Sequence, residues 1–199
     1  MTPMPDLEPA ARRMAALLAN VPDHRLDAPT PCADTSLGAL IDHVNGLALA
    51  FTWAAAKDFP EGGSQPPSAD ASSLAPDWRA RVPERLDALA AAWRSPDAWS
   101  GMTAAGGIDL PGEQAGHVAM NELIVHGWDV ARATGQTYDA GEDEIESCLA
   151  FVGPTVEQSG GKGVPGLFGP AVDVPADAPA LDRLIAMTGR DPSWTPPAA

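Results

Sequence analysis

The spacing of apolar residues along the chain predicts four substantial helices. In four segments, apolar side chains recur every three or four positions, which would place them on one face of a helix. These segments are residues 6–20, 34–57, 77–94 and 111–134. Because the third segment contains Pro83, its helix either begins near that residue or is kinked there.

The residues that flank these segments fit helix ends. Asp6 can cap the first helix, and a short polar side chain among residues 34–36 can cap the second, because such side chains accept hydrogen bonds from free backbone N–H groups. Pro111 suits the first turn of the fourth helix, and Gly135 suits a left-handed C-cap after its end.

The rest of the chain predicts shorter elements and loops. Residues 142–153 favour a short helix, and residues 181–187 allow a last one. The segments rich in proline, glycine or serine are predicted loops: 21–33, 59–76, 95–107 and 153–179. We expect 59–76 to be a flexible connection and 153–179 to be a surface wrap or a mobile loop. The alternation typical of a strand is visible only in a short piece at 168–174.

Four substantial helices joined by long connections predict an all-α protein. The expected fold is a four-helix bundle with an extra short C-terminal helix. The length of 199 residues suits one domain, which we expect to span residues 1–199, and an apolar fraction of 45% can fill its core.

Charge and cysteine content limit the partners and the cellular compartment that we expect for the protein. A net charge of −15 and a pI near 4.4 argue against nucleic acid or an anionic membrane surface as a partner. No segment approaches the roughly 18 apolar residues of a membrane span, and the N-terminus lacks the basic-then-apolar pattern of an export signal. Because Cys32 and Cys148 cannot form a disulfide framework, a reducing cytoplasm is the simpler expectation.

The fourth predicted helix contains an unusual carboxylate. Apolar residues lie on several sides of 111–134, which indicates a central helix and also permits a homodimer without requiring one. Glu122 lies near the middle of this segment. A carboxylate there needs a cation or strong hydrogen bonds, because the burial of an unpaired charge is costly.

The spacing around Glu122 favours a metal site. His126 follows four residues later, so the two side chains lie one turn apart on the same helix face. They make two thirds of a metal site with two histidines and one carboxylate, and His43 is the best candidate for the third ligand. Metal sites in bundles are built from inward side chains on facing helices, and three protein ligands leave a position open for water or substrate.

Other interpretations of these residues stay open at this point. Glu122 and His126 can form an ordinary intrahelical hydrogen bond, and His43 can be a boundary histidine beside an apolar stripe. His117 lies five residues before Glu122, so it points about 140° away and fits the site poorly. Asp129 can orient a ligand histidine from outside the site, or pair with the arginine three residues further along.

Other motifs that carry chemistry are weak or absent. The sequence lacks the His-Glu-x-x-His signature of zinc proteases, and the Gly-Gly-Lys-Gly run at 160–163 lacks the context of a phosphate-binding loop. No serine or cysteine stands in a recognisable nucleophile elbow. We expect Cys32 to be a small buried residue that pins its loop, Cys148 to be packed in a helix, and His24 to be a solvated loop residue.

Several runs of residues together resemble a known family. They are the Pro-Thr-Pro-Cys run at 29–32, the Leu-Ile-Asp-His-Val run at 40–44, and the run at 122–135 that contains His-Gly-Trp-Asp. The chain resembles the DinB-like metal-binding superfamily, in the actinobacterial branch related to the N-terminal domain of mycothiol-dependent maleylpyruvate isomerase. Residues 178–184 and 188–194 also look like that branch, so the resemblance covers nearly the whole chain.

This resemblance implies a single DinB-like helical domain that binds a divalent metal, usually zinc. Carried over by position, the ligands are His43, Glu122 and His126. The resemblance also implies mycothiol, a low-molecular-weight thiol, as co-substrate, because a coordinated thiol loses its proton and becomes a nucleophile. The isomerase carries a second, α/β domain that contributes to its site, and we expect this chain to be too short to include one.

Three functions follow from these observations. The first is a thiol (mycothiol)-dependent S-transferase or isomerase that acts on a small electrophile. The second is a non-catalytic metal- or ligand-binding module of the same fold, which would bind metal without turnover. The third is a purely structural helical protein without metal.

Overall fold

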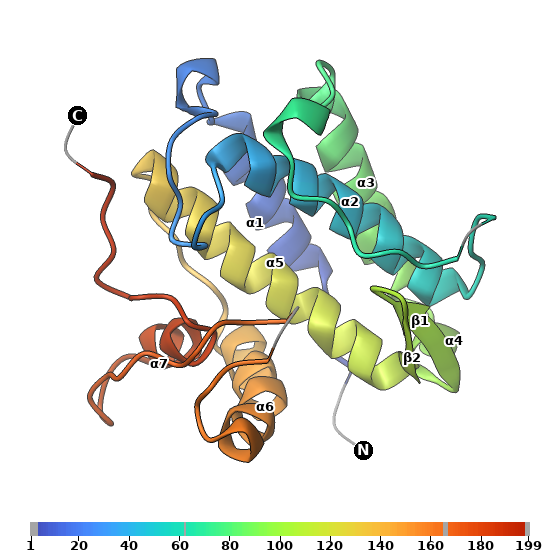
Figure 1. Cartoon of the computed structure of the whole chain (residues 1–199). Coiled ribbons are helices and arrows are strands. Elements are labelled where there is room, and N and C mark those ends of the chain that lie inside the picture. The colour runs from blue at the N-terminus through green and yellow to red at the C-terminus, as the bar shows by residue number, and fades with distance from the viewer. Residues whose placement is uncertain (1–3, 62, 165–166, 198–199) are drawn as a thin grey trace.

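Four long helices pack around one another in the computed structural model, which describes residues 4–61, 63–164 and 167–197. The helices are α1 (Glu8–Ala19), α2 (Leu37–Ala56), α3 (Trp78–Ala92) and α5 (Gly112–Thr134). The pairs α1–α3, α3–α2, α2–α5 and α5–α1 are in contact, so the four helices close into a bundle (Figure 1). The predicted helical bundle is therefore confirmed.

The predicted caps of α2 and α5 are observed, whereas the N-cap of α1 is Leu7 rather than Asp6 and Pro111 precedes the first turn of α5. Ser36 is the N-cap of α2, where its hydroxyl accepts a hydrogen bond from the Ala39 N–H at 3.3 Å. Helix α5 ends at Gly135 in the left-handed conformation. Pro83 lies inside α3, and the helix continues through it after starting five residues earlier.

Helix α6 (Glu142–Ser159) is longer than predicted. The boundary predicted at residue 153, where a segment dense in glycine and proline begins, is wrong. The helix runs through Gly153 and Pro154, as α3 runs through Val82 and Pro83, and its C-cap is Gly160.

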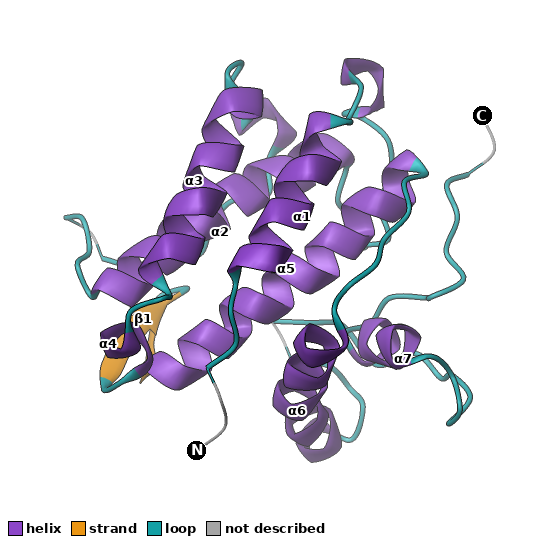
Figure 2. Cartoon of the chain, turned by 180° about the vertical axis from the view of Figure 1, so that it is seen from behind, coloured by secondary structure: helices purple, strands orange, loops and turns teal. Residues whose placement is uncertain are grey.

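A small hairpin was missed by the sequence analysis. Strands β1 (Met102–Ala105) and β2 (Ile108–Pro111) pair antiparallel beside the short helix α4 (Pro96–Trp99), at one end of the bundle (Figure 2). Gly106 and Gly107 both have positive φ, as the type I′ turn of a two-residue hairpin requires. The loop predicted for this region is therefore wrong in part, and the strand predicted at 168–174 is not formed.

The segment between α2 and α3 is packed against α2, contrary to the flexible connection predicted for 59–76. Within it, a single 3-10 turn (Ala71–Ser73) contacts α2. Two groups of this segment, the Ser68 hydroxyl and the Asp70 N–H, donate hydrogen bonds to the buried carboxylate of Asp42 at 2.6 and 3.3 Å. A polar side chain on α2 therefore holds the connection in place.

The C-terminal third lies on the outer side of α5. Helix α6 packs against α5, and helix α7 (Ala180–Met187) packs against α6 (Figure 1). Helix α5 is therefore covered both by the bundle and by this layer, which explains the apolar residues on its several faces. Within the described residues, no helix has the length and apolarity that a membrane span needs.

We predict that Gly116→Ala destabilises the protein. A Cβ at this position of α5 would overlap the ring of Trp99 and lie 2.8 Å from the ring of Trp93. Such overpacking costs about 1–3 kcal/mol, which outweighs the gain in helix propensity. Chemical denaturation measures the change, and Gln114→Ala, at an exposed position of the same helix, is the control with an expected change under about 0.5 kcal/mol. A Gly116→Ala variant more stable than the wild type would contradict this packing.

Candidate metal centre

Two neighbouring helices bring the three predicted ligands together. His43 lies in the second turn of α2, and Glu122 and His126 occupy successive turns in the middle of α5. Their ligand atoms all lie within 4.8 Å of one another. His117, excluded on helical geometry, faces elsewhere and contacts Ser147 of α6 through a 3.3 Å hydrogen bond.

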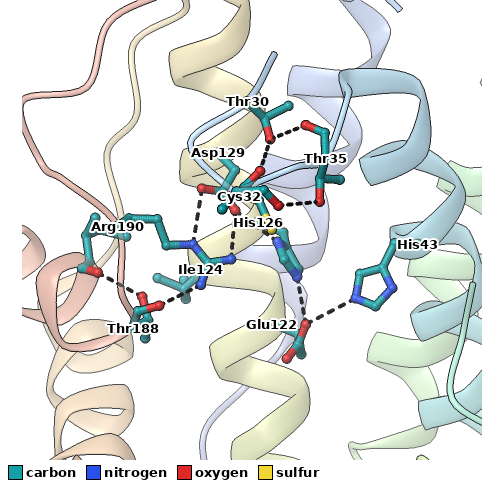
Figure 3. A network of polar contacts seen from close by, with 12 residues as sticks. Thr30, Cys32, Thr35, His43, Glu122, Ile124, His126, Asp129, Thr188 and Arg190 are labelled. Atoms are coloured by element: carbon teal, nitrogen blue, oxygen red, sulfur yellow. Dashed lines mark hydrogen bonds and ion pairs between the residues drawn. The ribbon is translucent and has the colours of Figure 1, made fainter. Parts of the chain in front are cut away.

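Both imidazoles face the same carboxylate oxygen. Oε2 of Glu122 lies 2.9 Å from Nε2 of His126 and 3.8 Å from Nε2 of His43, and the two rings are nearly perpendicular (Figure 3). Two atoms that each bind one ion at about 2.1 Å can be at most about 4.2 Å apart. Both distances to Glu122 satisfy this limit, so the carboxylate can share a cation with either imidazole.

The carboxylate oxygen of Glu122 has no regular hydrogen bond. It is buried, and none of the described residues donates one to it with suitable geometry despite the nearby ring nitrogens. A buried polar atom of this kind normally has a donor or a cation as partner. This oxygen therefore marks a position that favours a positive charge, which either a protonated His126 or a cation can provide.

His43 is oriented by the connection between α2 and α3. Its Nδ1 lies 3.2 Å from the backbone carbonyl oxygen of Ser68, which can only accept a hydrogen bond, so Nδ1 carries the proton. The Ser68 hydroxyl in turn donates to Asp42. The free electron pair of His43 is therefore on Nε2, the atom that faces Glu122.

His126 is oriented by Asp129 in the same manner. Its Nδ1 donates a hydrogen bond to Oδ2 of Asp129 at 3.0 Å, which leaves Nε2 to face Glu122. Asp129 is fully buried and forms an ion pair with Arg190. Of the two roles considered for Asp129, orienting a histidine is thus the one found. Arg132 instead donates to the Pro192 carbonyl.

Charges in the site favour a cation between Glu122 and His126. Burial is the largest single influence on both groups, and it opposes their ionisation. The attraction and hydrogen bonds between Glu122 and His126, together with His43 and Asp129, outweigh it. They lower the pKa of Glu122 well below its usual range and raise the pKa of His126 to about 10. Near neutral pH a proton therefore lies on His126 beside the Glu122 carboxylate, where a divalent cation would replace it.

Cys32 lies closer to the site than the sequence analysis expected. It is partly exposed rather than buried, and its sulfur lies within 4.8 Å of ligand atoms of His126 and Asp129. Thr30 shapes its loop by donating to the carbonyl of Cys32. A cation between these three groups is disfavoured, because the Arg190 guanidinium already occupies the Asp129 carboxylate.

The second cysteine and the loop histidine behave as predicted. Cys148 is packed in the core, and burial raises the pKa of its thiol to about 12. His24 is exposed in its loop. Neither contributes to the site.

Most of the residues that support or flank the two histidines were missed because they lie far from them in the sequence. Ser68 and Asp42 support one histidine, and Arg190 and Cys32 lie beside the other. The proximity of Asp42 to His43 in the sequence was the one available signal for this group. Nothing in the spacing connects Arg190 with α5, which it reaches from 61 residues away.

The donor set fits a divalent cation. Two neutral imidazole nitrogens and one carboxylate oxygen are ligands that zinc and similar ions accept. Both imidazoles donate their other N–H to an oxygen, as metal-binding histidines almost always do. The chain therefore has a candidate metal-binding group at His43, Glu122 and His126.

Known proteins share the fold of this bundle. Two crystal structures of mycothiol-dependent maleylpyruvate isomerase, one of them a histidine-to-alanine variant, match with TM-scores of 0.58 and 0.60 at 21% identity. They cover 75% and 79% of this chain, and 66% and 70% of their own chains. At this identity the match shows the fold.

Sequence comparison extends the relationship. The uncharacterized proteins MT0763 and Rv0738 of Mycobacterium tuberculosis are each 30% identical over 205 residues, which cover 96% of this chain and 98% of theirs. The sequence profile described as the mycothiol maleylpyruvate isomerase N-terminal domain matches residues 7–131, which contain all three candidate ligands. The chain therefore belongs to the mycothiol maleylpyruvate isomerase N-terminal domain family.

Proposed function

We propose that this protein binds a divalent cation, preferentially zinc, through His43, Glu122 and His126, and that it transfers a low-molecular-weight thiol to a small electrophile. The observation that carries the proposal is the buried Glu122 oxygen without a regular hydrogen bond, which has Nε2 of His126 at 2.9 Å and Nε2 of His43 at 3.8 Å. A helix pair held together only by packing has no need of this arrangement.

The thiol follows from the family. The family description and the structural relatives name mycothiol, and we propose mycothiol as the co-substrate of this chain also. A divalent cation supplies Lewis acidity, which lowers the pKa of a thiol that binds to it. We place the reaction in the reducing cytoplasm, since the two cysteines of the chain are free thiols.

The residues of the chain have separate tasks in this proposal. His43 and His126 present neutral Nε2 atoms, and Glu122 contributes the negative charge that compensates part of the cation. Ser68 and Asp129 keep the Nδ1 protons of the two rings facing outward. His43 is the most exposed of the three ligands, with 24% of its side chain accessible, so thiol and electrophile would enter on its side.

The proposed reaction is an addition of sulfur to carbon. The thiol loses its proton to solvent, and its sulfur bonds to one carbon of an activated double bond as the π bond breaks. If the neighbouring carbon takes up a proton from solvent, the product is an S-conjugate. If instead the new single bond rotates and the thiolate leaves as the double bond re-forms, the result is isomerisation. We propose that the single domain at residues 1–199 carries the whole site.

Metal content tests the first half of the proposal. Protein purified without a histidine tag and incubated with zinc should retain about one equivalent after dialysis, because three ligands converge on one position. His43→Ala, Glu122→Ala and His126→Ala should each retain far less, as measured by elemental analysis. His117→Ala is the matched control on the same helix and should bind as the wild type does. Equal zinc in His126→Ala and wild type would exclude this site.

Thiol consumption tests the second half. The zinc-loaded protein should consume mycothiol in the presence of a panel of small electrophiles, and Glu122→Ala should not. Zinc binding without turnover would identify a non-catalytic metal-binding module. The absence of both would leave a structural helical protein.

Binding of the cation should release about one proton. Below pH 10, His126 holds the proton that the cation must displace, because its pKa is raised to about 10. The apparent zinc affinity should therefore rise about tenfold per pH unit between pH 6 and 8. Calorimetry in buffers with different ionisation enthalpies measures the released proton. A binding enthalpy independent of the buffer would show that His126 is not protonated in the metal-free protein.

A further inference from the structure

The chain beyond the region that defines the family reaches back to the metal centre. The family profile ends at residue 131, whereas Arg190 follows α7 near the C-terminus. The N–H of Arg190 donates to the carbonyl of Ile185, so the chain turns at the end of α7. This turn directs the arginine side chain toward α5 (Figure 3).

Arg190 holds Asp129 with two nitrogen atoms. Nη2 lies 3.1 Å from Oδ2 of Asp129, and Nε lies 3.4 Å from Oδ1. The remaining nitrogen, Nη1, donates to the Thr188 carbonyl at 2.9 Å. The Arg190 side chain is 9% exposed and that of Asp129 0%, so this ion pair is shielded from water. A two-pronged contact of this kind fixes the plane of a carboxylate as well as its charge.

The carboxylate of Asp129, held by Arg190, sets the orientation of the His126 ring. Oδ2 of Asp129, one of the two oxygens held by Arg190, also accepts the hydrogen bond from Nδ1 of His126. If the carboxylate turned, Nδ1 would lose its acceptor and the ring could rotate or change tautomer. The Nε2 atom would then no longer point at Glu122.

We propose that Arg190 is a positioning residue of the metal centre. It acts through Asp129 on His126, so that the segment after α7 completes a cation site whose ligands lie in the bundle. This inference rests on the proposed metal site. It assigns a role in metal binding to a residue outside the family-defining region, and it predicts that the C-terminal segment sets the affinity for the metal.

The chain offers a matched control for the alternative that Arg190 only anchors the C-terminal segment. Arg132, on the same helix as Asp129, donates to the carbonyl of Pro192, two residues after Arg190. Its guanidinium also lies 5.2 Å from the centre of the Trp128 ring. Arg132→Ala therefore removes another anchor of the same segment without removing the contact to Asp129.

The test measures cobalt(II) and zinc affinity by competition with a chelator, together with the visible spectrum of the cobalt(II) protein. Arg190→Ala should weaken binding about tenfold or more, the size typical of residues that orient metal ligands, and should change the cobalt spectrum. Arg190→Lys should fall between the wild type and Arg190→Ala, since lysine retains the charge but not the two-pronged contact. Arg132→Ala should bind within about twofold of the wild type with an unchanged spectrum.

A double-mutant cycle tests whether Arg190 affects metal affinity through Asp129. If Arg190 acts through Asp129, Arg190→Ala should weaken binding further by less than about twofold in an Asp129→Ala background. If Arg190→Ala does not fold, the same cycle with Arg190→Lys carries the test.

Three results would overturn the inference. The first is a metal affinity and cobalt(II) spectrum unchanged in the Arg190 variants, and the second is a loss of metal affinity in Arg132→Ala equal to that in Arg190→Ala. The third is that the losses of affinity caused by Arg190→Ala and Asp129→Ala are fully additive in the double variant. A wild type that binds neither cobalt nor zinc would instead refute the proposed metal site itself, which keeps the two failures distinguishable.

Discussion

The carboxylate of Glu122 lies on the central helix of the bundle, and its charge must be compensated there. A charge so placed is costly unless a cation or strong hydrogen bonds stabilise it. The neighbouring α2 supplies His43, and the next turn of α5 supplies His126. Many of the polar contacts around these helices orient the two imidazole rings toward one carboxylate oxygen.

Each ring is aimed by a different part of the chain. The backbone of the connection before α3 accepts the proton of His43, and Asp42 fixes that connection through Ser68. On the other side, Asp129 accepts the proton of His126 and is itself held by the C-terminal segment. The precision of the site therefore depends on loops, although its three candidate ligands lie on helices. Such outer contacts determine which ring nitrogen is free to bind a metal.

The helices and the Glu122–His126 pair were predictable from sequence because both depend on local spacing, whereas the choice of His43 was supported by the family resemblance. Apolar periodicity gave the four bundle helices, and the four-residue interval placed Glu122 and His126 on one face. The hairpin at 102–111 was missed because strands of four residues are too short for a clear alternation. The end of α6 was misplaced because glycine and proline usually indicate a loop, whereas this helix continues through both.

The contacts of Cys32 and Arg190 could not be predicted, since they depend on how loops return to the bundle. The Pro-Thr-Pro-Cys run resembled the family, but its own sequence gave no sign that the sulfur would approach His126. Arg190 reaches Asp129 only because α7 packs beside α5 and α6 in the folded protein. Long-range contacts of this type carry no periodic signal.

The central claim is that two imidazoles and one carboxylate share a single cation. X-ray absorption spectroscopy on the zinc-loaded protein, without added thiol, tests it most directly. The claim predicts nitrogen and oxygen neighbours at about 2.0–2.2 Å, with the scattering of two imidazole rings. A sulfur neighbour at about 2.3 Å or the absence of imidazole scattering would contradict it, because the cation would then lie beside Cys32 or outside the bundle.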